Sequence, residues 1–269
     1  MGEEHIMVTT VSSSTALVTG AGRGIGKAIA ERLAADGHDL ALNDVSQNAE
    51  MLEATAEEIR ASGRKVTTAL ADVSDAAQVK EMVAKTVADH GRLNVMVANA
   101  GIARVTSLLE MDVEEWDHVM AVNLRGVFLC YTEAARQMIA QGGGGKIIGA
   151  ASIVAYRPFA LLSHYSASKW GVRGLTQGAA MEWAKHGITV NAYCPGIVGT
   201  AMWDLIDQKL AAEEGMQRGE ALKKYSESIH LGRVSVPEDV AKLVSYLASP
   251  DSDYMTGQSI MIDGGIQFS

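Results

Sequence analysis

Two side chains with complementary chemistry stand four residues apart in this 269-residue chain, the phenol of Tyr165 and the ammonium of Lys169. On a helix, both would lie on one face. A free phenol has a pKa of about 10, which is too high for a base near neutrality. An ammonium about 4 Å away, at an effective dielectric constant of about 20, contributes roughly 4 kcal/mol, or about three pKa units. The pair therefore predicts a tyrosine general acid–base that works near neutral pH.

A tyrosine four residues from a lysine is common by chance, so this hypothesis needs further residues. Ser152 lies thirteen residues before Tyr165, at the end of a strand-like run. A hydroxyl there can donate a hydrogen bond to a developing oxyanion. His164 is an alternative base, but its neighbours fit a helix start at the surface, so we expect no catalytic role for it.

The elements that must position these residues are short apolar runs that alternate with longer stretches of helical periodicity. Such alternation implies right-handed crossovers and a parallel sheet with helices on both faces. We expect one α/β domain over residues 14–269, a Rossmann-type doubly wound parallel sheet of seven strands, after a flexible tail at residues 1–13. The expected strands are Ala16–Thr19, Leu40–Asn43, Val66–Leu70, Val95–Ala98, Lys146–Ala150, Thr189–Tyr193 and Ser259–Ile262, and the expected helices are Gly26–Asp36, Ala49–Ser62, Ala77–His90, Glu114–Ala140, Ser166–His186 and Pro237–Ala248.

The clearest ligand signal is the run Thr19-Gly20-Ala21-Gly22-Arg23-Gly24-Ile25-Gly26, between the first strand and the first helix. Its glycines allow a tight turn and let a pyrophosphate approach the backbone at a helix N-terminus. Asp44 ends the second strand, where a carboxylate can bind both ribose hydroxyls of NAD and repel the 2′-phosphate of NADP. Arg23 could pair with that phosphate, but a carboxylate beside a phosphate is costly and Arg23 is flexible. We therefore expect NAD.

The spacing of this loop resembles the Thr-Gly-x-x-x-Gly-x-Gly of the short-chain dehydrogenase/reductase family. The resemblance continues through Asp72-Val73, Asn99-Ala100-Gly101, Pro195-Gly196 and Asp263-Gly264-Gly265, and so covers nearly the whole chain. The family's catalytic positions are filled by Asn123, Ser152, Tyr165 and Lys169. The resemblance implies NAD contacts from Gly20, Arg23, Gly24, Ile25, Gly26, Asp44, Asp72, Val73, Asn99, Ala100, Gly101, Tyr165, Lys169, Pro195, Gly196, Val198 and Thr200.

The same resemblance implies a role for several of these residues. The pair Asp72-Val73 is expected to hold the adenine ring, and the segment 195–200 to hold the nicotinamide carboxamide. Lys169 is expected to bind the nicotinamide ribose. Asn123 is expected to anchor a chain of water molecules that returns the proton to solvent through Lys169.

Within the family, the chain most resembles the diacetyl/acetoin reductases, also called 2,3-butanediol dehydrogenases. Ser152, Ile153, Phe159 and Trp203 fall where the family binds substrate, and their apolar neighbours suit a small uncharged hydroxyketone or diketone. Ile153 beside Ser152 favours the branch that makes an (S)-carbinol. The segment 154–158 is bulkier and more basic than a butanediol enzyme leads us to expect. Residues 201–230 are expected to form a mobile helical lid.

Two other functions fit the same motifs. The first is reduction of another carbonyl, such as a 3-oxoacyl thioester, a cyclic ketone or a sugar. The second is a binding or sensor protein that keeps the fold without catalysis. Such proteins usually lack the serine or the tyrosine–lysine pair, whereas all these positions are intact here.

The composition excludes several classes of function. A net charge of −9 disfavours nucleic acid as a partner, because binding a phosphate backbone needs a basic face. No apolar run reaches the roughly 20 residues that span a bilayer, so we expect no membrane partner and a cytoplasmic location. The two cysteines, Cys130 and Cys194, suit a reducing compartment and form no metal-binding cluster. The family resemblance implies a homotetramer built through the stretches 114–140 and 166–186.

Overall fold

The computed structural model describes residues 14–268, and in this part of the chain seven strands form one sheet. Their order is β3-β2-β1-β4-β5-β6-β7, and every neighbouring pair runs parallel. The strands are β1 (Thr15–Thr19), β2 (Asp39–Asp44), β3 (Val66–Leu70), β4 (Val95–Ala98), β5 (Gly145–Ala150), β6 (Ile188–Pro195) and β7 (Ser259–Ile262). The predicted seven-stranded parallel sheet is confirmed. The predicted tail, residues 1–13, lies outside the described residues.

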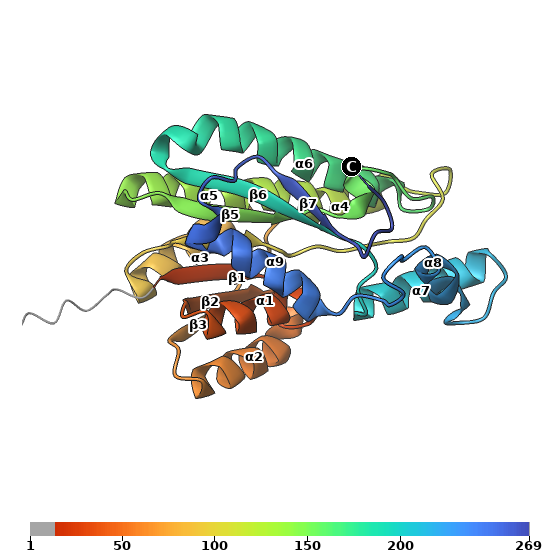
Figure 1. Cartoon of the computed structure of the whole chain (residues 1–269), viewed down its shortest axis with the longest axis horizontal. Helices are drawn as coiled ribbons and strands as arrows, with labels where there is room; N and C mark the ends of the chain where they lie inside the picture. Colours follow the sequence, from red (N-terminus) through yellow and green to blue (C-terminus); the bar gives the residue numbers. More distant parts are fainter. Residues whose placement is uncertain (1–13, 269) are drawn as a thin grey trace, which may run out of the picture.

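Helices cover both faces of this sheet (Figure 1). One apolar core packs α1, α2 and α9 against one face, and a second core packs α3, α5 and α6 against the other. Between residues 14 and 268, no helix is long and apolar enough to cross a membrane. The helices are α1 (Gly24–Ala35), α2 (Ala49–Ala61), α3 (Ala76–His90), α4 (Val113–Met120), α5 (Gly126–Gln141), α6 (Ser163–Trp183), α7 (Ala201–Glu213), α8 (Glu220–Ser226) and α9 (Pro237–Ala248).

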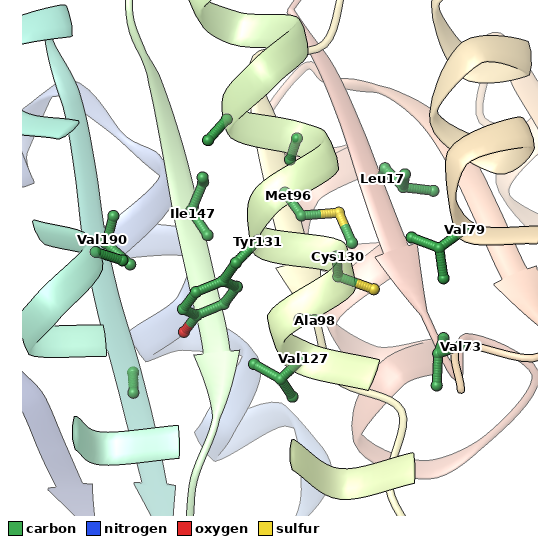
Figure 2. Packing of buried hydrophobic residues seen from close by; sticks show 14 of the residues in the cluster. Leu17, Val73, Val79, Met96, Ala98, Val127, Cys130, Tyr131, Ile147 and Val190 are labelled. Atoms are coloured by element: carbon green, nitrogen blue, oxygen red, sulfur yellow. The ribbon is translucent and has the colours of Figure 1, made fainter. Parts of the chain in front are cut away.

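Successive residues of a strand enter the two cores in turn, as the twofold period of a strand requires. In β1, Leu17 joins the core under α5, whereas Val18 joins the core under α1. Figure 2 shows the core under α3, α5 and α6, which includes Tyr131 of α5, Met96 of β4 and Ile147 of β5. A one-residue register slip would move each side chain of a strand from one core to the other, so packing on both faces fixes the register.

The strand order reverses at β1, which pairs with β2 on one side and with β4 on the other. The loops that follow β1 and β4 therefore lead away in opposite directions. Ligands of open parallel sheets bind in the crevice that such a reversal leaves at the carboxyl ends of the strands. The predicted glycine loop follows β1 and the predicted Asn-Ala-Gly turn follows β4, so both motifs lie at this point of the fold.

The helix predicted over 114–140 is interrupted in the structure. A wide π-helical turn, Ala121–Arg125, separates α4 from α5 and contains Asn123. The Asn123 side chain accepts a hydrogen bond from the Ile102 backbone N–H and donates one to the Ile102 carbonyl, each at 2.9 Å. These bonds hold the side chain toward the loop after β4 and stabilise the wider turn. Apolar periodicity could not predict the interruption, because the helical pattern continues on both sides of it.

The expectation that His164 lies at a surface helix start is wrong. α6 does begin there, but α4 packs against its first turn and leaves His164 fully buried. The His164 Nε2 lies 3.3 Å from Glu115 Oε1 of α4, and neither ring nitrogen has an aligned hydrogen-bond partner among the described residues. Burial lowers the pKa of His164, and the nearby Glu115 carboxylate opposes this effect. The imidazole is therefore neutral near pH 7.

This burial predicts a loss of stability in acid. Burial also lowers the pKa of His38 and His90. A histidine with a lowered pKa binds its proton more readily in the unfolded chain, so protonation favours unfolding. We expect the free energy of unfolding to be level above about pH 6.5, the ordinary histidine pKa, and to fall as the pH drops below it. Urea denaturation at several pH values measures this slope.

Two variants isolate the contribution of His164 to this slope. His164→Asn should reduce the slope of unfolding free energy against pH in the acid range. His186→Asn, at an exposed position after α6, should leave the slope as in the wild type. Equal slopes for wild type and His164→Asn would contradict the assignment.

Candidate active site

The loop after β1 has the backbone geometry of a dinucleotide turn. Gly20 and Gly24 have φ angles of +66° and +57°, in the left-handed region that side chains disfavour. A Cβ at Gly26 would overlap the Gly20 carbonyl oxygen, so α1 can pass this close only with glycine. α1 begins at Gly24, and its first N–H groups have no partner within the helix, which favours an anion. Ile25 is partly buried, and Arg23 is exposed at the N-cap.

Asp44 ends β2 beside this loop and is 7% exposed. One carboxylate oxygen accepts a hydrogen bond from the Gly22 N–H at 3.0 Å. The other accepts from the Val45 N–H and from Asn48 Nδ2, both at 2.8 Å. These donors fix the carboxylate against the glycine loop. The contribution of Asn48 was not predicted, because an asparagine four residues after a strand has no distinctive spacing.

The turn after β4 is tied to β1 and β6. The Thr19 Oγ1 accepts hydrogen bonds from the backbone N–H groups of Asn99 and Ala100, both at 3.0 Å. The Asn99 side chain donates to the Thr19 carbonyl at 2.8 Å and accepts from the Tyr193 hydroxyl at 2.8 Å. The ends of three strands are thus held together. Sequence analysis placed Asn99 and Ala100 at the site and missed the supporting Thr19 and Tyr193.

The pair Asp72-Val73 after β3, which is expected to hold the adenine ring, has one exposed and one buried side chain. Asp72 is exposed, and its Oδ1 accepts from the Ser74 N–H at 2.8 Å. Val73 is buried against α5, where a Cβ at Gly126 would lie 2.8 Å from Val73 Cγ2. Asp72 alone of the two presents a polar group to solvent.

The segment after β6 returns toward the glycine loop. Pro195 ends β6, and the Gly196 N–H donates to the end of β7 at 3.1 Å. Val198 is buried, and Thr200 precedes α7. A Cβ at Gly24 would lie 3.6 Å from Thr200 Cγ2. The segment expected to hold the nicotinamide carboxamide therefore approaches the loop expected to hold the pyrophosphate.

Three of the predicted catalytic residues meet at the end of β5. Ser152 follows this strand and is 7% exposed, while Tyr165 and Lys169 lie on α6. The Lys169 Nζ is 5.4 Å from the centroid of the Tyr165 ring. It donates a hydrogen bond to the Ala150 carbonyl at 2.7 Å. A hydrogen bond between Ser152 and Tyr165 lowers the pKa of the phenol and places the two hydroxyls together.

Asn123 and Gly101 complete this group. A Cβ at Gly101 would lie 3.3 Å from Asn123 Oδ1 and 3.5 Å from Lys169 Nζ. The Asn123 Nδ2 also lies 3.3 Å from the Ser168 hydroxyl oxygen, to which it donates. The π-helical turn, the loop after β4 and α6 therefore converge on the ammonium group.

The expected lowering of the Tyr165 pKa is not found. Burial raises the pKa of Tyr165 to about 12, although the hydrogen bond with Ser152 opposes it. Burial also lowers the pKa of Lys169 to about 8. The expectation counted the attraction between the charged forms and left out the cost of removing each charge from water. A further charge placed beside either group would therefore shift its pKa.

An apolar cluster packs against Tyr165. Ala103, Ile206, Leu210, Ala211 and Ala221 form its buried part. Tyr165 packs against it together with Phe159 and Trp203, so the structure brings two predicted substrate residues to the predicted base. Leu161, with φ of +64°, and Tyr225 of α8 join the same cluster and were not predicted. No motif marks either residue in the sequence.

Ile153, the remaining predicted substrate residue, follows Ser152 and is partly buried. Its carbonyl accepts a hydrogen bond from Gln267 Nε2 at 2.6 Å. The Gln267 N–H in turn donates to Asp263 Oδ2 at 3.0 Å. The chain after β7 thus supports the backbone next to Ser152. This contact joins residues 114 positions apart, so sequence spacing could not predict it.

Comparisons with known proteins agree with this geometry. The family described as short chain dehydrogenase matches residues 14–211. The chain is 47% identical to the L-2,3-butanediol dehydrogenase of Corynebacterium glutamicum, over 96% of this chain and 100% of that one. It is 45% identical to an (S)-acetoin-forming diacetyl reductase of Staphylococcus epidermidis, over 95% and 99% of the two chains. The solved acetoin dehydrogenase of Enterobacter cloacae superimposes with a TM-score of 0.83 and is 33% identical, over 95% and 96%.

The chain thus resembles a known group of oxidoreductases in sequence and in fold. The match spans most of the chain, and the relatives are covered over nearly their whole length. The protein belongs to the short-chain dehydrogenase/reductase family.

Proposed function

We propose that the protein is an NAD(H)-dependent oxidoreductase that interconverts a small secondary alcohol and its ketone, with acetoin, diacetyl and 2,3-butanediol as its substrate class. One observation carries the proposal: Tyr165, bonded to Ser152 and beside Lys169, also packs into the apolar cluster with Phe159 and Trp203. Apolar side chains therefore pack beside Tyr165, which suits a small uncharged ketone. The names of the butanediol and diacetyl relatives support the same class.

The residues of the crevice fit NAD. The glycine turn leaves space that a Cβ at Gly20, Gly24 or Gly26 would fill or strain, so a pyrophosphate can approach the backbone. The Asp44 carboxylate is fixed at the end of β2 by the Gly22 N–H. A carboxylate held there suits two ribose hydroxyls and disfavours a 2′-phosphate.

NAD(H) held by the glycine turn and Asp44 would supply the hydride acceptor for the alcohol and the hydride donor for the ketone. Ser152 binds the substrate oxygen and stabilises its developing negative charge by donating a hydrogen bond. Tyr165 removes the hydroxyl proton during oxidation and returns it during reduction. Lys169 keeps its ammonium near the phenol, because the Ala150 carbonyl accepts one of its hydrogen bonds. Asn123 lies near Lys169 and hydrogen-bonds to the loop after β4. It would therefore extend the path of the proton from Lys169 toward that loop.

We also infer a homotetramer in the cytoplasm. Helices α4, α5 and α6 leave large apolar side chains exposed, namely Trp116, Phe128, Trp170 and Met181. Protein interfaces commonly bury exposed apolar side chains of this kind. The free cysteines Cys130 and Cys194, both buried, suit a reducing compartment.

A panel of carbonyl compounds assayed with both coenzymes tests the proposed function. Diacetyl and acetoin with NADH should give the highest kcat/KM, at least about tenfold above an acetoacetyl thioester, a cyclic ketone or a sugar. Preference for one of those compounds would replace the substrate class. NADH binding without turnover of any ketone would support the non-catalytic sensor instead.

The pH dependence of the two directions tests the base. Because burial raises the pKa of Tyr165 to about 12, the phenolate becomes more populated as the pH rises. The kcat/KM for alcohol oxidation should therefore increase from pH 7 to pH 9.5, while that for ketone reduction stays level near neutrality. Tyr165→Phe should lose at least about a hundredfold in turnover and still bind NADH, as measured by fluorescence titration. A flat oxidation profile would refute the assignment.

Coenzyme preference should depend on Asp44. Asp44→Ala removes the carboxylate that repels a 2′-phosphate, so the ratio of kcat/KM with NADH to that with NADPH should fall at least about tenfold. Arg23→Ala is the comparison variant, and its ratio should rise, because Arg23 can pair with the 2′-phosphate of NADPH. An unchanged ratio in Asp44→Ala would make Arg23 the determinant.

A further inference from the structure

The segment expected to form a lid folds as one tied unit. The Asp207 side chain on α7 is 4% exposed, and its two oxygens accept hydrogen bonds from the Gly219 and Leu222 N–H groups at 2.6 and 2.7 Å. These donors lie at the start of α8, where backbone N–H groups have no helical partner. A buried carboxylate therefore fixes α8 on α7, and the two helices move or stay together.

One aromatic side chain connects this unit to the segment that precedes Tyr165. The Tyr225 ring of α8 meets the Phe159 ring edge to face, with centroids 4.9 Å apart and an angle of 70°. Phe159 lies between Ser152 and Tyr165, far from α8 in the sequence. The contact therefore joins two separate segments of the chain. The contact is an attractive aromatic geometry and exists only while α8 lies over this segment.

The polar end of Tyr225 is held independently. Its hydroxyl donates to Glu214 Oε1 at 2.6 Å, and the other oxygen of Glu214 pairs with Lys224 Nζ at 2.5 Å. Burial raises the pKa of Tyr225 to about 12, and the hydrogen bond to Glu214 adds to this effect, so the hydroxyl remains a donor. The ring is therefore fixed at both ends, by Phe159 at its edge and by Glu214 at its oxygen.

We propose that Tyr225 is a specificity-determining residue, which closes the apolar wall around the reacting carbonyl and limits substrates to short uncharged chains. The inference rests on the proposed function and adds to it the group that sets substrate length. Tyr225 shares one apolar cluster with Tyr165, Phe159 and Trp203. Because a fixed ring cannot swing aside, a longer acyl chain has to displace α8.

Turnover of vicinal diketones of increasing length tests this role. Wild type should reduce diacetyl best and 2,3-heptanedione poorly. Tyr225→Ala should raise the ratio of kcat/KM for 2,3-heptanedione to that for diacetyl at least about tenfold, mainly through KM. Tyr225→Phe keeps the ring and loses only the hydrogen bond to Glu214, so it should raise the ratio less than Tyr225→Ala does. Tyr254→Ala, at a fully exposed position, is the matched control and should change nothing.

Hydrogen–deuterium exchange of the α8 amides gives a second readout that needs no substrate. Tyr225→Ala and Phe159→Ala should each increase exchange across residues 219–226 at least about fivefold, and the double variant should add little, because both changes remove the same contact. Unchanged exchange in Tyr225→Ala would overturn the contact. An unchanged chain-length ratio would overturn the specificity role. If wild type reduces no diketone, the proposed function fails, and the exchange rates alone then support or overturn the hold of Tyr225 on Phe159.

Discussion

The site depends on one constraint: the Tyr165 phenol and the Lys169 ammonium are both removed from water at the same place. Lys169 is 3% exposed, and the desolvation of both groups moves their pKa values toward the neutral forms, to about 12 for Tyr165 and about 8 for Lys169. The Ala150 backbone carbonyl accepts a hydrogen bond from the ammonium and compensates part of this cost. With little water to screen it, any charge that enters changes both proton equilibria strongly. The site is thereby suited to proton transfer controlled by its ligand.

Side-chain hydrogen bonds between strand ends shape the crevice next to this place. Thr19, Asn99 and Tyr193 join the ends of β1, β4 and β6 at the strand reversal. The glycine turn and the Asp44 carboxylate are fixed by similar short-range contacts. Such preorganisation spares a ligand the cost of ordering the groups that meet it.

Local patterns predicted the fold well, and they failed where distant elements meet. The seven strands, the glycine turn and the placement of Ser152 follow from periodicity and spacing, which are properties of neighbouring residues. His164 was assigned to the surface because its sequence neighbours cannot report that α4 covers it. The Tyr165 pKa was predicted to fall because spacing gives the distance to a charge and says nothing about lost hydration. Tyr225 and Gln267 have no motif and act through long-range contacts.

One apolar cluster connects the proposed specificity residue Tyr225 to Tyr165. The apolar cluster that contains Tyr225 and Trp203 also contacts Tyr165, so the side chains that would limit substrate size also take water away from the phenol. If Tyr225 has the proposed role, a substitution that moves α8 away from this cluster has two physical consequences, more room for a substrate and better hydration of Tyr165. Better hydration favours the phenolate and so lowers the pKa of Tyr165. Under this proposal, a variant with relaxed substrate selectivity should also have a lower Tyr165 pKa.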